Sequence, residues 1–210
     1  MTSVNRKIAF SVKIYNCEPI LFDIRPGLWY TIKWIFIRMR DKMIILGIDP
    51  GLAIIGWGVV EFKASKFRTV AYGALRTPAG IPTEDRLKLI YEGMKALLDT
   101  YHPDAMSVEE LFFNTNVTTG IRVAEARGVI LLAARQANVP MQEYTPPQVK
   151  QAVVGYGKAE KAQVMAMVTR VLGLKEVPKP DDTADALALA ICHAHSGASH
   201  IASYYNKNTI

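Results

Sequence analysis

The chain has 210 residues, half of them hydrophobic, so it is long enough to bury a sizeable core in one domain with a short appendage. Its two cysteines, Cys17 and Cys192, exclude a disulfide framework and a zinc-binding spacing, which fits the reducing cytosol. The N-terminal apolar run, residues 28–37, is interrupted by Lys33 and is shorter than the ~20 residues that cross a bilayer. We therefore predict a cytoplasmic protein with no membrane association.

The formal net charge of +6 is unevenly distributed along the chain. Residues 1–42 contain eight Lys/Arg and three Asp/Glu, a net charge of +5, which leaves +1 for residues 43–210. Because the core is nearly neutral as a whole, a nucleic acid would have to bind where basic groups of the core cluster.

The hydrophobic pattern predicts strands and helices in a defined order after residue 42. The predicted strands are 43–49, 54–62, 67–76, 105–109 and 140–144, and the first is expected to be central in its sheet. The predicted helices are 83–101, about 120–137, a short helix opened by the Pro-Pro pair at 146–147, about 159–172, and one that begins near residue 181. Three sequential strands followed by alternating helices and strands indicate an α/β protein with a mixed five-stranded sheet.

Four acidic residues in apolar surroundings give the main functional signal. Asp49 and Glu109 each end an apolar strand, while Asp182 and Asp185 lie three residues apart on one face of an Ala- and Leu-rich helix. A buried carboxylate is costly unless it is paired or binds a metal, and the sequence shows no regular basic neighbours. Carboxylate oxygens suit Mg²⁺ or Mn²⁺, and two such ions can hydrolyse a phosphodiester, so the pattern predicts a two-metal nuclease site.

Each of these acids also has an ordinary explanation. Asp49, before a Pro-Gly turn, would by itself simply end a strand, and the helix dipole favours acids in a first helical turn, a role that Asp181 fits. The place of Asp49 at the C-terminal end of a central strand favours a site, because open α/β sheets bind ligands there. We expect Glu109 rather than Glu110 to contribute, because neighbouring side chains of a strand point to opposite faces.

Seven motifs follow one another from Met43 to about Cys192, and their order is specific. They are residues 48–51, 56–60, 108–112, 125–129, 148–151, 159–164 and 182–188. In this order they resemble the RuvC-type Holliday-junction resolvases (crossover junction endodeoxyribonucleases). The resemblance implies a ribonuclease-H-like fold, in which helices flank a mixed five-stranded sheet. It also implies an endonuclease of recombination and repair that resolves four-way DNA junctions by paired symmetric nicks, leaving 5′-phosphate and 3′-hydroxyl ends.

The resemblance further implies roles for individual residues and for partners. The four acids would hold two Mg²⁺ ions per active site, with Mn²⁺ as a substitute. Lys150 and Lys161 would lie at the scissile phosphate, Lys158 would contact DNA, and Phe112 would stack on a base near the crossover. Without the resemblance, the lysines would be read as solvated surface groups and Phe112 as a core residue, although Lys161 in a first helical turn could also contact an anion. The helix at 120–137 would form a two-fold homodimer, and a RuvA/RuvB-type branch-migration complex would be the partner.

Other classes of protein fit less well. An actin-like ATPase or sugar kinase also ends its first strand in Asp-x-Gly, but it needs a second phosphate loop on a duplicated domain, and the chain is too short for two. A non-catalytic junction-binding relative would lack one of the acids, and a generic ribonuclease H would not explain Phe112 or the helix at 120–137. The histidines His193, His195 and His200 are predicted to lie at the surface or near the chain end.

Residues 1–42 are predicted to precede a nuclease domain at 43–197, with a tail at 198–210. The N-terminal segment holds two of the three tryptophans and five other aromatic residues, but no clean helical or strand period long enough to build a domain. Either Met43 is the true start and the segment is flexible, or the segment is a basic, aromatic arm that adds DNA affinity. We favour the first interpretation, because Met43 begins its strand without a linker.

Overall fold

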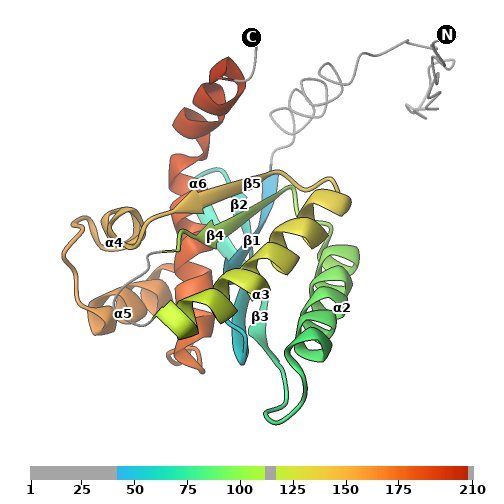
Figure 1. The fold of residues 1–210 in the computed structure, drawn as a ribbon. Coiled ribbons are helices and arrows are strands. Elements are labelled where there is room, and N and C mark those ends of the chain that lie inside the picture. The colour runs from blue at the N-terminus through green and yellow to red at the C-terminus, as the bar shows by residue number, and fades with distance from the viewer. Residues whose placement is uncertain (1–41, 112–116, 208–210) are drawn as a thin grey trace, which may run out of the picture. The chain divides into compact units, whose positions relative to one another are not determined.

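The computed structural model describes residues 42–111 and 117–207, which belong to one compact unit of the chain (Figure 1). The predicted role of Phe112 and the N-terminal segment therefore lie outside the described residues. The strands are β1 (Lys42–Asp49), β2 (Ile54–Lys63), β3 (Lys66–Arg76), β4 (Ala105–Glu109) and β5 (Met141–Tyr144). The helices are α2 (Thr83–Tyr101), α3 (Val117–Gln136), α4 (Pro146–Val154), α5 (Lys161–Val171) and α6 (Asp181–Lys207).

The strands form one mixed sheet in the order β3-β2-β1-β4-β5, so the prediction of a five-stranded sheet with a central first strand is confirmed. β1 pairs antiparallel with β2, which pairs antiparallel with β3, whereas β4 runs parallel to β1 and β5 parallel to β4. Parallel strands need a crossover connection, and α2 and α3 supply the two that lead into β4 and β5. The C-terminal ends of β1, β4 and β5 consequently meet at one edge of the sheet.

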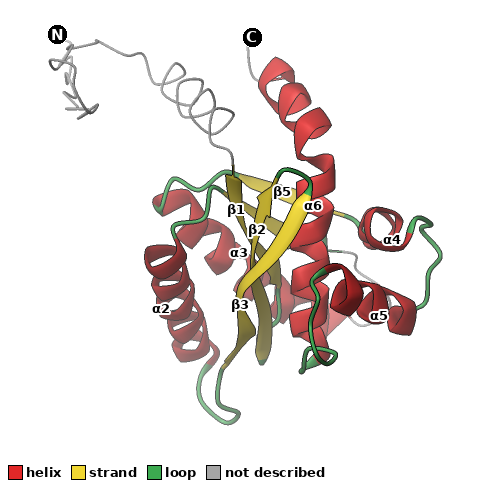
Figure 2. Ribbon diagram, turned by 180° about the vertical axis from the view of Figure 1, so that it is seen from behind, coloured by secondary structure: helices red, strands yellow, loops and turns green. Residues whose placement is uncertain are grey.

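Helices cover both faces of the sheet. α2 and α3 pack on one face, and α6, flanked by α4 and α5, packs on the other; the view from behind shows the sheet between these two layers (Figure 2). α2 buries Ile90, Met94, Leu97 and Leu98, which recur at helical spacing and face the sheet as the sequence predicts. No described helix is both long enough and apolar enough to cross a membrane.

The approach of α6 to the sheet depends on glycines in the strands. A Cβ atom at Gly47 of β1 would overlap the carbonyl oxygen of Ala186, and one at Gly56 of β2 would overlap that of Asp182. The buried face of α6 is rich in alanine, so the helix backbone can lie directly on β1 and β2. This contact places the first turns of α6 beside the C-terminal end of β1.

Candidate active site

Asp49 and Glu109 stand side by side at the C-terminal ends of two neighbouring parallel strands. Ile48 of β1 pairs with Val108 of β4, so the residues that follow them are neighbours across the sheet. Gly47, two residues before Asp49, faces α6, and side chains of a strand alternate, so Asp49 and Glu109 also lie on the α6 side. The two carboxyl groups are close enough for each to shift the pKa of the other. The structure thus joins two acids that are 60 residues apart in the sequence.

The other two acids come from the first turns of α6. Burial, and after it the charges of Glu109, Asp185 and Asp182, raises the pKa of Asp49 to about 8. Burial also raises the pKa of Glu109, and the charge of Asp185 adds to the effect. Electrostatic coupling of this kind falls off within a few ångströms in a solvated site. The structure therefore gathers the four acids predicted from the sequence into one cluster.

Lys161 supplies a basic partner that the sequence spacing does not reveal. Its Nζ lies 3.0 Å from Oδ2 of Asp185 and 3.5 Å from Oδ2 of Asp181. Burial alone would lower the pKa of Lys161, but the hydrogen bond to Asp185 and its charge raise it. At Asp185 the balance is reversed, because burial raises the pKa of the carboxyl more than Lys161 lowers it. One lysine therefore offsets only part of the negative charge of the cluster.

The donor set suits a hard divalent cation. Among residues 42–111 and 117–207, no three Asp, Glu, His or Cys side chains are already arranged as the ligands of one ion. The cluster nevertheless consists of carboxylates alone, which are the ligands that Mg²⁺ and Mn²⁺ prefer. A bound cation would offset both the cost of burial and the repulsion between carboxylates, which together raise the pKa of Asp49. The residues present thus fit the predicted metal ions.

The remaining predicted residues lie on elements next to this cluster. Lys150 is half-buried on α4, and Lys158 is exposed in the loop between α4 and α5. Both helices pack against α6, but within the described chain neither lysine forms an ion pair with the four acids. Lys161, in the first turn of α5, is the lysine that the structure places at the carboxylates.

A buried tyrosine–histidine pair adjoins the cluster and was not anticipated. Tyr144 is the register partner of Glu109, and its carbonyl oxygen accepts a hydrogen bond of 2.9 Å from the amide of Glu110. The Tyr144 hydroxyl lies 2.9 Å from Nδ1 of His193 on α6. Tyr144 therefore fixes the chain after Glu109 through its backbone and ties β5 to α6 through its side chain. Glu110 itself is exposed, so the choice of Glu109 over Glu110 agrees with the burial of the two residues.

The prediction that His193 lies at the surface is wrong, because only 3% of the residue is exposed. Burial lowers its pKa to about 4. His195 is exposed, as predicted, and the side chain of His200 lies outside the described residues. Eleven residues, about three helical turns, separate His193 from Asp182, so the helical period indicates that both lie on the sheet-facing side. That period is the signal by which the sequence would have placed His193 correctly.

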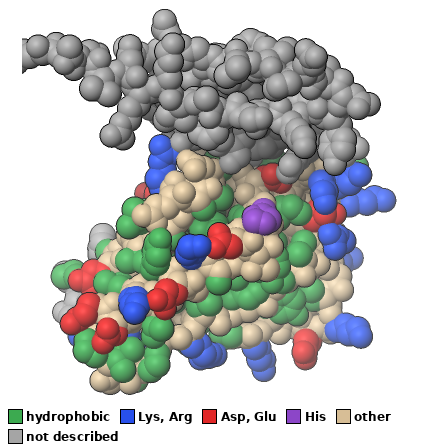
Figure 3. Space-filling view, turned by 90° about the vertical axis from the view of Figure 1, so that its right-hand side faces the viewer, with side chains coloured by type: hydrophobic (Ala, Val, Ile, Leu, Met, Phe, Trp, Pro, Cys, Tyr) green, Lys and Arg blue, Asp and Glu red, His purple; other side chains and the backbone are tan. Residues whose placement is uncertain are grey.

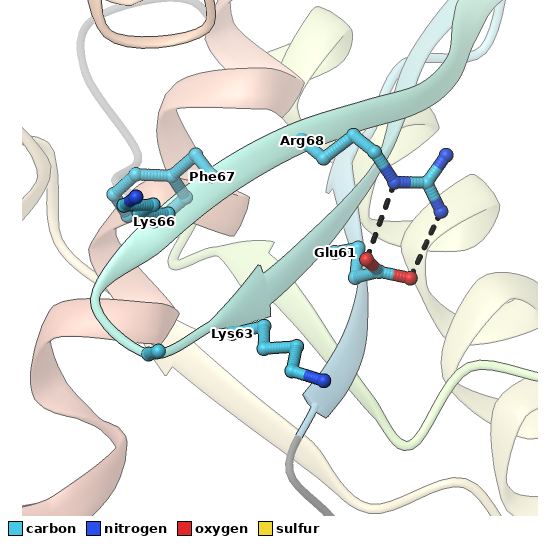
Figure 4. A pocket seen from close by; sticks show the side chains of 6 residues that line it. Glu61, Lys63, Lys66, Phe67 and Arg68 are labelled. Atoms are coloured by element: carbon cyan, nitrogen blue, oxygen red, sulfur yellow. Dashed lines mark hydrogen bonds and ion pairs between the residues drawn. The ribbon is translucent and has the colours of Figure 1, made fainter.

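The hollow at the β2–β3 hairpin lies at the opposite end of β2 from the acids. It has a volume of about 290 Å³, and its walls include Glu61, Lys63, Lys66, Phe67 and Arg68 (Figure 4). Glu61 accepts a hydrogen bond of 2.9 Å from Arg68, and this bond is the main reason why its pKa is lowered to about 2. The hairpin is thus an ion-paired surface feature, whereas the charge of the acid cluster is only partly compensated.

Comparisons with known proteins agree with this geometry. The family model described as crossover junction endodeoxyribonuclease RuvC matches residues 45–193, a segment that contains all four acids. The RuvC of Clostridioides difficile (strain 630) is 60% identical over 154 residues, which are 73% of this chain and 91% of that protein. The RuvC of Brevibacillus brevis is 62% identical over 152 residues, which are 72% of this chain and 92% of that protein.

Solved structures show the same fold. Thermus thermophilus RuvC matches with a TM-score of 0.70 and 39% identity over 75% of this chain and 97% of that chain. The same protein in complex with a Holliday junction substrate matches with a TM-score of 0.69 and 37% identity, over 74% of this chain and 96% of that chain. The resemblance inferred from the motifs and the ribonuclease-H-like fold class are therefore confirmed.

Proposed function

Because the chain belongs to the RuvC family of crossover junction endodeoxyribonucleases, we propose that it is a metal-dependent endonuclease that resolves four-way DNA junctions. The observation that most directly supports this function is the acid cluster. Asp49 and Glu109 come from adjacent parallel strands, and Asp182 and Asp185 come from the helix that covers those strands. The relative from T. thermophilus, which shares this fold, was solved with a Holliday junction substrate.

The four carboxylates would hold two Mg²⁺ ions, with Mn²⁺ as a substitute, and the bound ions would activate water and stabilise the leaving oxygen. Lys161 would exchange its ion pair with Asp185 for the scissile phosphate as a cation neutralises the acid. Lys150 would also lie at the scissile phosphate, Lys158 would contact DNA, and Phe112 would stack on a base near the crossover. The products would carry a 5′-phosphate and a 3′-hydroxyl.

A homodimer would contain two such active sites, so that each could nick one of two junction strands in a paired, symmetric cleavage. The outer face of α3 leaves Ile121 and Leu132 exposed by 53% and 52%, although both are large apolar side chains. Gly128, between them at helical spacing, has open space beyond its backbone. Figure 3 shows another side of the molecule, the right-hand side of Figure 1, where hydrophobic side chains are interspersed with Lys, Arg, Asp and Glu. An exposed apolar stripe of this kind supports a two-fold contact through α3.

Family membership also supports a cytoplasmic protein that works with a RuvA/RuvB-type branch-migration complex in recombination and repair. The test that follows uses the protein without this partner.

The decisive experiment offers the protein three DNA substrates with Mg²⁺: a synthetic four-way junction, the matching linear duplex and an RNA–DNA hybrid. We expect paired nicks in strands of like polarity on the junction, with ends that a DNA ligase can seal. Asp49→Asn is the matched control, because it keeps the shape of the side chain and removes its negative charge. Equal cleavage of the duplex or hybrid, or full activity of Asp49→Asn, would contradict the proposed function.

A further inference from the structure

An aromatic ring in the loop that leads into α5 is exposed and yet held in place. Tyr156, in the loop between α4 and α5, has 45% of its surface exposed. Its hydroxyl donates a hydrogen bond of 2.7 Å to Oε1 of Gln163, and the same oxygen accepts one of 2.9 Å from the amide of Glu160. Core packing cannot explain a ring whose surface is so largely in solvent. Its orientation is instead fixed by the first turn of α5.

The loop that carries Tyr156 is itself tied down. Gly155 adopts the left-handed conformation with φ 97° and ends α4. Its amide donates to the carbonyl oxygen of Gln151 at 3.0 Å, and its own carbonyl oxygen accepts from Nε2 of Gln151 at 2.7 Å. Gly157, the residue after Tyr156, lies against Pro147. A ring presented on such a support loses little conformational freedom when a ligand binds.

The surroundings of the ring are cationic. Lys158 is exposed two residues after Tyr156, and Lys161 lies in the same first turn of α5 as Gln163. Lys150 on α4 is a third basic residue in this stretch, against the single acid Glu160, so residues 150–161 carry a net charge of +2. Lys161 also links the stretch to the carboxylates through its contact with Asp185.

An open aromatic ring with lysines before and after it in the sequence matches one ligand chemistry in particular. Nucleic-acid strands offer a base that stacks on the ring and phosphates that bind the lysines. A protein partner would offer an apolar side chain, but the flanking lysines favour a polyanion. Lys161, in the same turn of α5 as Gln163, contacts Asp185 of the acid cluster, which favours the strand that is being cut.

We propose that Tyr156 is a DNA-binding residue that stacks on an unpaired base of the cleaved strand, near the scissile phosphate, while Lys158 contacts an adjacent phosphate. This inference rests on the proposed nuclease function and adds a second aromatic contact, on the α4–α5 side of the acids. The stacked base holds the strand in register with the carboxylates, so loss of the ring weakens binding and slows cleavage together.

The test compares Tyr156→Ala, Tyr156→Phe and the control Tyr72→Ala. Tyr72, on the edge strand β3, is 39% exposed and is thus a similar surface ring. Junction affinity is measured without divalent cations, and single-turnover cleavage is measured with Mg²⁺. Tyr156→Ala should bind roughly 5- to 100-fold more weakly, the range expected for one stacked base. Tyr156→Phe should stay close to wild type, because it keeps the ring, and Tyr72→Ala should not differ from wild type.

A second measurement shows whether the contact is direct. Abasic sites are placed one at a time at each nucleotide near the crossover, and 2-aminopurine replaces the base at the most sensitive position. In wild type, one abasic position should weaken binding, and 2-aminopurine there should be quenched. Tyr156→Ala should lose both effects, because no ring remains to stack.

The outcomes separate this inference from the function on which it rests. Failure of the wild-type protein to bind or cut the junction would defeat the proposed function. Normal wild-type activity together with unchanged affinity of Tyr156→Ala would overturn the stacking proposal alone. Tyr156→Phe as defective as Tyr156→Ala would also overturn it, because the hydroxyl bond to Gln163, and not the ring, would then be required. Sensitivity to an abasic site that persists in Tyr156→Ala would exclude direct contact.

Discussion

Burial of His193 should make the protein less stable as pH falls, and the substitution His193→Asn should remove this contribution. Its pKa is lowered by burial from 6.5 to about 4, and its Nδ1 lies 2.9 Å from the Tyr144 hydroxyl. Asn at this position carries a polar atom close to where Nδ1 lies, so contact with Tyr144 can be retained while titration is lost. The comparison between wild type and His193→Asn therefore isolates the effect on stability of protonating His193.

The size and sign of the effect follow from linkage. Between about pH 4 and 6.5 the unfolded His193 binds a proton that the folded one does not, so this residue makes unfolding easier as pH falls. Its stabilising contribution is fully present above pH 6.5 and is lost as pH falls towards 4. Each pH unit between the two pKa values is worth about 1.4 kcal/mol, which gives a loss of about 3 kcal/mol across the window.

The buried carboxyl group of Asp49 opposes this trend in both proteins. The pKa of Asp49 is raised to about 8, so folding stabilises its protonated form and this contribution is lost as pH rises. The stability of wild type alone is consequently a mixture of opposite effects. The difference between wild type and His193→Asn removes the carboxyl contribution, because both proteins contain the same acids.

The assay is urea unfolding followed by tryptophan fluorescence at several pH values between 4 and 7.5, without divalent cations. The free energy of unfolding of wild type minus that of His193→Asn should fall by about 3 kcal/mol as pH falls from 7 to 4. His195→Asn, an exposed position on the same helix, should show no such change. A difference that stays constant with pH within about 0.5 kcal/mol would refute the reasoning.

Four further predictions test the site, the packing of α6, the dimer and the N-terminal segment. Asp182→Asn should abolish cleavage and leave junction binding intact in a gel-shift assay; cleavage within tenfold of wild type, about 1.4 kcal/mol, would exclude this residue as a metal ligand. Gly47→Ala should destabilise the protein by about 1–3 kcal/mol or more in urea unfolding, because the new Cβ overlaps the backbone of Ala186; unchanged stability would mean that α6 can shift without cost. Leu132→Glu should convert a dimer into a monomer by analytical ultracentrifugation with the circular dichroism of wild type, and an unchanged sedimentation coefficient would place the contact elsewhere. Deletion of residues 1–42 should leave the rate and specificity of junction cleavage unchanged and improve solubility, whereas loss of cleavage would show that the segment is functional.

The sequence determined the elements of the fold because each is encoded by a local pattern. The helix α2 (Thr83–Tyr101) and the strand β4 (Ala105–Glu109) have the predicted bounds, since their apolar periods and flanking turns are unambiguous. The candidate acids could also be predicted from the sequence. Asp49 and Glu109 each end an apolar strand, and an acid in that position is unusual enough to be noticed without knowledge of its neighbours.

Only the tertiary structure decided which side chains meet. The partner of Asp185 is Lys161, 24 residues earlier on a different helix, and the burial of His193 depends on Tyr144 of β5. A hydrophobic period tells which face of an element is buried, but the distance between two elements depends on the packing between them. Here that distance depends on Gly47, whose missing side chain lets α6 lie on β1 and brings its acids to the ends of the strands.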